Sequence, residues 1–72
     1  MPTIDMKATG RNIKAKMAAK GMKTKDIQDI FGFNTPKAIF KWFRGDAIPT
    51  VDNLVVLAKV LDTTIDDIII VF

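Results

Sequence analysis

Three cations near the middle of the chain have the type and spacing to hold an anionic partner. Lys37, Lys41 and Arg44 share a short segment whose apolar centre is Ile39. On a helix that turns about 100° per residue, the three cations lie about 140–200° from Ile39 and so opposite the apolar face. A helix about 10–12 Å across fits the DNA major groove, where Lys and Arg donate to guanine or to phosphates. Basic helices that face only solvent show the same pattern. The elements around this segment are therefore needed to decide between a DNA-binding helix and a solvated one.

The segment 36–44 has the boundary residues of a helix. Thr35 is a favourable N-cap, and Pro36 at the first helical position costs no backbone hydrogen bond. Gly45 is a typical residue just past a helix end. The buried face of this helix is predicted to consist of Ile39, Trp42 and Phe43.

A second short helix is predicted before it, from about Thr24 to Phe31, with Gly32 at its end. Its apolar face would be formed by Ile27, Ile30 and Phe31. Two short helices joined by a tight turn are the pattern of a helix-turn-helix.

Three further helices complete a predicted all-α domain. Asp5 caps a helix to about Lys20, in which Gly10 costs about 1 kcal/mol relative to Ala. Thr50 and Thr64 cap two more. The apolar residues expected to face inward from these helices are Met6, Ile13, Met17, Leu54, Leu57, Ala58, Leu61, Ile65, Ile68 and Ile69, with Met22 at the core edge. We therefore expect one five-helix domain over residues 1–72, with a short N-terminal tail 1–4 and an apolar tail 70–72.

The apolar tail needs an explanation of its own. One helix cannot bury five consecutive apolar residues on a single face, so Ile70, Val71 and Phe72 must be placed otherwise. A frayed end, a short extended segment and a contact with a second copy are all open. A homodimer would suit DNA binding, because two recognition helices about 34 Å apart reach successive major grooves.

Charge is divided unevenly along the chain. Residues 1–45 carry ten Lys or Arg against three Asp, a net charge of +7. Residues 46–72 carry Lys59 against five Asp, a net charge of −4. This separation favours an anionic partner for the first part of the chain: nucleic acid, an anionic membrane or an acidic protein.

The composition argues against catalysis and metal binding. The chain has no Ser, Cys, His, Tyr or Glu, which removes most nucleophiles, general bases and metal ligands. Asp66 and Asp67 are best read as acids in the first turn of a short helix. No apolar run approaches the roughly 20 residues of a membrane helix, and residues 1–5 do not resemble a signal peptide. We expect no enzyme activity, cofactor, metal, membrane contact or small-molecule ligand, and a cytoplasmic location.

Residues 10–69 resemble the Cro/repressor-type (XRE-like) helix-turn-helix family of bacterial and phage transcription regulators. The strongest part of the resemblance is Trp42-Phe43-Arg44-Gly45 followed by Ile48-Pro49-Thr50 and the Leu-x-x-Leu-Ala pattern at residues 54–58. The other residues that carry it are Ile13, Lys20, Gly21, Ile27, Phe31, Gly32, Ile39, Phe40, Lys41, Lys59, Val60, Leu61, Ile65, Asp66, Asp67 and Ile68.

The resemblance implies a lambda-repressor-like fold that binds double-stranded DNA, with the helix 36–44 in the major groove. It implies base-edge contacts from Lys37 and Lys41, with Pro36, Ala38 and Phe40 at the groove surface. The phosphate contacts that it implies come from Thr24, Lys25, Thr35 and Arg44. The free N–H groups at the start of the helix from Thr24 add a physical reason for a phosphate there.

Three residues or segments depart from the family pattern. The turn 32–35 is one residue longer, Gln28 replaces a small Ala, and Phe40 replaces a polar residue that faces the groove. Phe can contact a thymine methyl. Alternatively, Phe40 and Phe33 belong to an apolar patch that, with the tail 70–72, docks an acidic or apolar protein partner.

Overall fold

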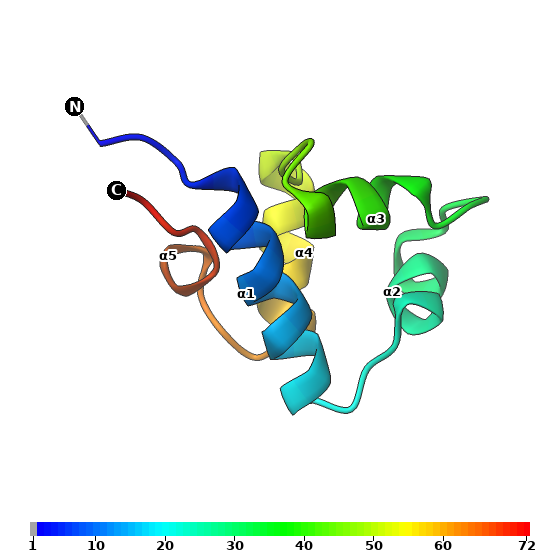
Figure 1. The fold of residues 1–72 in the computed structure, drawn as a ribbon. Coiled ribbons are helices and arrows are strands. Elements are labelled where there is room, and N and C mark those ends of the chain that lie inside the picture. The colour runs from blue at the N-terminus through cyan, green and yellow to red at the C-terminus, as the bar shows by residue number, and fades with distance from the viewer. Residues whose placement is uncertain (1) are drawn as a thin grey trace.

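The computed structural model describes residues 2–72, which form five helices (Figure 1). In chain order these are α1 (Met6–Ala19), α2 (Thr24–Phe31), α3 (Lys37–Arg44), α4 (Val51–Val60) and α5 (Ile65–Ile68). Across residues 2–72 the one extended pairing is an isolated antiparallel bridge between Ile4 and Val71. No helix in this range has the length and apolarity needed to span a membrane. The all-α, five-helix prediction is confirmed.

Every helix contributes one fully buried aliphatic side chain to the core. These residues are Ile13, Ile27, Ile39, Leu57 and Ile68, each with no exposed surface. Met17, Trp42, Leu54 and Leu61 complete the core. Two residues assigned to inward faces do not belong there: Met6 is 36% exposed and Ile30 is 48% exposed. Met6 is exposed because it is the first residue of α1. Ile30 is exposed because α2 packs mainly on α3 and therefore buries only a narrow stripe of its own surface.

Side-chain caps start three of the helices at the predicted residues. The Asp5 carboxylate accepts from the Ala8 N–H at 3.0 Å. The hydroxyls of Thr50 and Thr64 accept from backbone N–H groups three residues on, at 3.3 and 3.1 Å. Each cap satisfies a backbone donor that has no partner within the helix.

The start of α3 lies one residue later than predicted. Pro36 is the N-cap, with φ −85° and ψ 10°, and the first helical residue is Lys37. The Thr35 hydroxyl accepts from the Lys37 N–H at a long 3.4 Å, so it supports the turn rather than serving as the N-cap. At the other end, Gly45 has φ +78°, a left-handed conformation in which a side chain is strained.

Gly10 allows the backbones of α1 and α3 to touch. A Cβ atom at this position would lie 2.0 Å from the Trp42 carbonyl oxygen and 2.8 Å from that of Phe43. Any side chain here would force the two helices apart. The sequence alone predicts only the low helix propensity of Gly10, whereas the structure shows that this residue brings the backbone of α1 against the end of α3.

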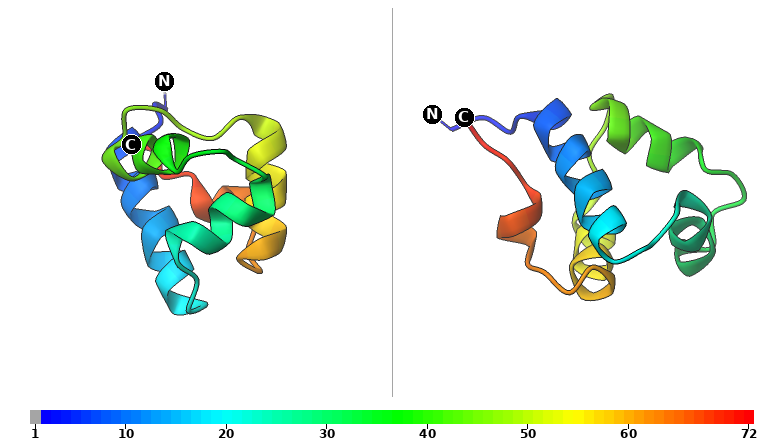
Figure 2. Two further views of the ribbon diagram at one scale, coloured as in Figure 1. Left: turned by 90° about the vertical axis from the view of Figure 1, so that its right-hand side faces the viewer. Right: turned by 60° about the horizontal axis from the view of Figure 1, so that its bottom comes forward.

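The apolar tail is a short extended segment that pairs with the start of the chain. Thr3 and Phe72 exchange two backbone hydrogen bonds of 3.2 and 2.9 Å, and the Asp5 N–H donates to the Ile70 carbonyl at 2.8 Å. The buried Thr9 hydroxyl accepts from the Ile70 N–H at 2.9 Å. The two ends therefore lie side by side (Figure 2). The tail is thus a short extended segment rather than a frayed end, and Phe72 is 74% exposed.

Candidate nucleic-acid interface

The outward face of α3 presents the three cations that the helical wheel grouped together. Lys37, Lys41 and Arg44 are exposed, whereas Ile39 is fully buried and Trp42 is 4% exposed on the opposite face. The α3 helix lies at the upper right of the molecule in Figure 1, above α2 and beside α1 and α4. Its basic face therefore points away from the body and is open to a large partner.

Within residues 2–72, Lys37 and Lys41, the cations predicted to contact base edges, form no ion pair. The two cations predicted to contact phosphates each form one. Lys25 binds Asp29 at 2.9 Å, and Arg44 binds Asp46 at 2.8 Å. Both pairs are exposed, and such pairs stabilise a protein by about 0–1 kcal/mol. An anionic ligand can therefore displace either carboxylate at little cost, and at Lys37 and Lys41 the described residues hold no carboxylate to displace.

The remaining predicted contact residues surround this face. Thr24 is half-buried as the first residue of α2, and Thr35 is exposed in the turn. Pro36 and Ala38 are half-buried, and Phe40 is 43% exposed. The structure thus places Lys37, Phe40 and Lys41 at the surface of α3. Pro36 and Ala38 are less exposed than these three residues.

An aromatic cluster holds α2 and α3 together. The rings of Phe31 and Phe33 are stacked with centroids 5.2 Å apart. Both meet Trp42 edge-on, at 5.8 and 6.1 Å. Phe33 is therefore half-buried inside the helix-turn-helix and contributes little to an exposed patch. Phe40 alone is left as an exposed aromatic residue on α3, with its ring 6.2 Å from that of Phe43.

Gln28 braces the lengthened turn. Its side-chain Nε2 donates to the Phe33 carbonyl at 3.1 Å, and the Phe33 N–H donates back to the Gln28 carbonyl at 3.0 Å. A small Ala could not make the first of these bonds. Gln28 and the turn, both of which depart from the expected pattern, are thus linked by two hydrogen bonds.

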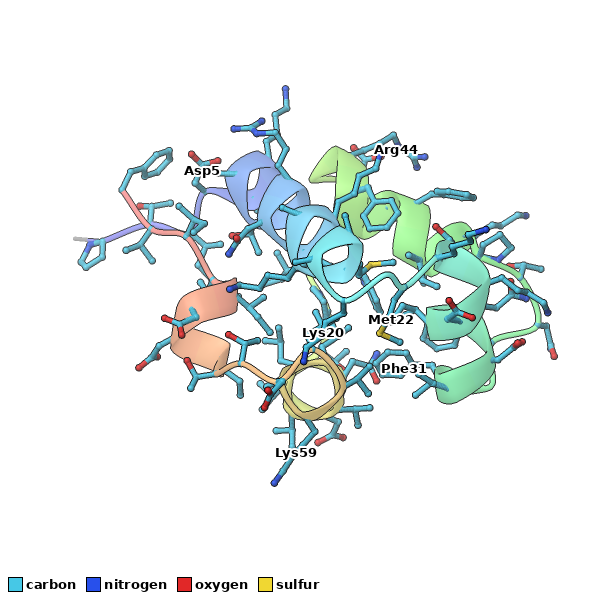
Figure 3. The ribbon with its side chains drawn as sticks, turned by 90° about the horizontal axis from the view of Figure 1, so that it is seen from below. Asp5, Lys20, Met22, Phe31, Arg44 and Lys59 are labelled. Atoms are coloured by element: carbon cyan, nitrogen blue, oxygen red, sulfur yellow. The ribbon has the colours of Figure 1, made fainter. Side chains whose placement is uncertain are left out.

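Two further cations lie beside the start of α2, and sequence analysis did not include them in the site. Lys14 and Lys23 line an open pocket of about 280 Å³ together with Thr24 and Phe43. The Lys14 Nζ atom also sits 5.5 Å above the Phe43 ring. The pocket has an apolar floor of Met17, Ala18 and Met22, and Met22 lies between α1 and α2 (Figure 3). The sequence does not predict that Lys14 and Lys23 lie together, because their proximity depends on how α1 packs against α3.

A position suited to control experiments lies on the side of the molecule opposite Arg44. Arg44 and Lys59 lie on opposite sides of the molecule (Figure 3). Lys59 is the one cation of residues 46–72 and lies on α4. It is thus an exposed lysine remote from the basic face of α3, and it serves as a matched control for experiments on that face.

Comparison with known proteins adds three findings. A helix-turn-helix family model matches residues 13–68, which is more than half of the chain. The 26 kDa repressor protein of Escherichia phage HK022 is 60% identical over 30 residues, which are 42% of this chain and 13% of the repressor. The chain therefore spans only about an eighth of that relative's length. The crystal structure of the DNA-binding domain of BldD shares the fold, with a TM-score of 0.73 and 18% identity, covering 90% of this chain and 93% of that one.

Proposed function

The chain belongs to the helix-turn-helix family, and from this premise we propose that it is a Cro/repressor-type transcriptional regulator that binds double-stranded DNA. The observation that carries the proposal is the outward face of α3, a helix anchored by Ile39 and Trp42. On this face Lys37 and Lys41 are exposed and form no ion pair with any residue of the described range 2–72. Repression, rather than activation, is favoured by the likeness to a phage repressor.

In this proposal α3 enters the major groove and reads base edges. Lys37 and Lys41 donate to guanine O6 and N7, and Phe40 contacts a thymine methyl. Pro36 and Ala38 line the groove surface. The phosphates on either side are held by Thr24, Lys25, Thr35 and Arg44, with Lys14 and Lys23 close enough to Thr24 to take part. The first N–H groups of α2 add their dipole to the same contact.

The family and the fold are those of DNA-binding regulators and not of enzymes. The competing function is a protein-interaction module that docks a partner through Phe40 and the apolar tail. The exposed side chains of Phe40, Val71 and Phe72 favour it, whereas Phe33 is engaged with Phe31 and Trp42. A partner that is retained after nuclease treatment would support that alternative.

A homodimer through the tail is part of the proposal. The tail pairs with residues 3–5, which leaves Val71 58% and Phe72 74% exposed beside Ile4. A second copy that covers these side chains would give a two-fold complex suited to a palindromic site. The proposal also places the protein in the cytoplasm, where bacterial and phage DNA is transcribed.

Charge reversal at Lys41 tests the assigned reading face. The Lys41→Glu variant should lose at least tenfold in affinity for a selected duplex, because a lost base contact alone costs about 1–3 kcal/mol. Its helicity and melting temperature should match the wild type, since Lys41 is exposed. Lys59→Glu, on the opposite side, should bind like the wild type. Equal affinities for the two variants in a gel-shift titration would show that the reading face is misassigned.

A further inference from the structure

The outer face of α4 is apolar at its centre and oppositely charged at its ends. Val55 and Val56 are 48% and 38% exposed, and Asp52 and Lys59 are exposed one turn to either side. At about 100° per residue these four positions, i, i+3, i+4 and i+7, cover an arc of about 100°. Leu54 and Leu57 occupy the opposite, buried face. Lys59 points away from the body of the molecule (Figure 3).

This pattern is complementary to itself. A two-fold axis placed midway between Val55 and Val56, perpendicular to the helix, brings a second α4 antiparallel to the first. The valines of both copies then meet at the axis. Asp52 lies at the same height as Lys59 of the partner subunit, so two charge pairs close the ends. We propose that the outer face of α4 is a self-association surface that binds a second copy of this chain in the antiparallel sense.

The charges select this arrangement over the parallel one. Parallel pairing of two α4 helices would place Asp52 against Asp52 of the partner subunit and Lys59 against Lys59 of the partner subunit, which is repulsive at both ends. Within residues 2–72 neither Asp52 nor Lys59 has an ion pair that would have to break first. The antiparallel pairing therefore has an attractive charge pair at each end, where the parallel pairing has a repulsive one.

The association is expected to be weak because the surface is small. A helix face of two turns offers less than the roughly 800 Å² per partner that stable complexes bury. It is therefore populated at high protein concentration, or where copies are held close together by a common ligand.

The consequence for DNA rests on the proposed function. The α3 helix lies across one end of the molecule, and α4 runs away from that end (Figure 2). An antiparallel pair of α4 helices therefore presents its two α3 helices in opposite directions. Two copies joined in this way cannot read one palindrome together, but they can hold two DNA segments side by side.

Charge variants of α4 test the surface without DNA. Sedimentation velocity over a concentration series up to the millimolar range should show association for the wild type. Both Asp52→Lys and Lys59→Asp should weaken it severalfold, and the double variant, which exchanges the charges, should recover it. Val55→Asn should abolish it. Val51→Asn is the matched control, because Val51 is 72% exposed at the edge of this face. Contacts through the tail are the same in every variant, and thermal melting checks that each one folds.

Failure of the double variant to recover, or a wild type without concentration dependence, would overturn the self-association surface. A bridging assay then tests its orientation: an immobilised duplex should capture a second, labelled duplex with the wild type but not with Val55→Asn. Normal binding to one duplex together with no capture would refute the antiparallel arrangement and leave the proposed function intact. Loss of all DNA binding, with association unchanged, would refute the proposed function alone.

Discussion

Phe40 is an aromatic residue on a helix face that otherwise carries cations, and 43% of it is exposed. Its ring meets that of Phe43 edge-on at 6.2 Å, which orients it without burying it. An exposed ring beside Lys37 and Lys41 cannot donate a hydrogen bond, so it can distinguish bases only by apolar contact. The thymine C5-methyl group is the apolar feature of the major groove.

A paired change of protein and DNA tests this role. Replacing thymine by deoxyuridine in a selected duplex should weaken wild-type binding about fourfold, since one methyl group is worth about 0.8 kcal/mol. Phe40→Ala should bind both duplexes equally and melt within a few degrees of the wild type. Anisotropy titrations of the four combinations give the coupling. The same thymine preference in Phe40→Ala would rule the contact out.

At the residue scale, the sequence predicts which side chains are exposed together but not what they touch. The helical wheel correctly grouped Lys37, Lys41 and Arg44, because periodicity depends only on local geometry. The Arg44–Asp46 pair and the bond from Gln28 to the Phe33 carbonyl depend on how the turn folds back. Phe33 was grouped with Phe40 on chemical type alone, whereas its stacking on Phe31 required the three-dimensional turn.

At the element scale, the position of α3 depends on its contact with α1. Gly10 lets the α1 backbone approach the carbonyl groups of Trp42 and Phe43 at the end of α3. The Trp42 side chain, near the same end of α3, packs edge-on against Phe31 and Phe33. The direction of the basic face is thus set by two small contacts, which explains how a short helix with eight residues keeps one orientation.

The Gly10→Ala variant shows whether helix propensity or packing dominates the effect of this residue on stability. Propensity alone predicts a gain of about 1 kcal/mol in stability, whereas overpacking against backbone predicts a loss of about 1–3 kcal/mol. We expect the loss, seen as a melting temperature lower by about 4–8 °C for each kcal/mol. Ala15→Gly, at an exposed position of the same helix, should lose about 1 kcal/mol through propensity. A Gly10→Ala variant more stable than the wild type would contradict the close approach.

Most element boundaries follow from the sequence, because caps and turn glycines act locally. Asp5, Thr50 and Thr64 each cap the helix predicted for them. The start of α3 was placed one residue early, since Thr35 and Pro36 can both serve as a helix start and the turn decides between them. Met6 and Ile30 were placed inside because periodicity gives a face but not how much of it a neighbour covers.

At the scale of the whole molecule, the charge asymmetry along the chain becomes an asymmetry in space. The basic first part contains α1, α2 and α3, and the acidic remainder contains α4 and α5. The paired ends fix the tail 70–72 beside residues 3–5, away from α2 (Figure 1). The sequence does not predict this pairing, because a contact between residues so far apart leaves no local signal.

The central claim is that the basic face of α3 binds the phosphates and bases of duplex DNA. Fluorescence anisotropy with a labelled mixed-sequence duplex, repeated over a salt series, measures this most directly. We predict that the logarithm of the association constant falls linearly with the logarithm of salt concentration, with a slope of about −0.9 for each phosphate neutralised. Absence of binding at low salt, or binding that does not depend on salt, would contradict the account and point instead to a protein partner at Phe40.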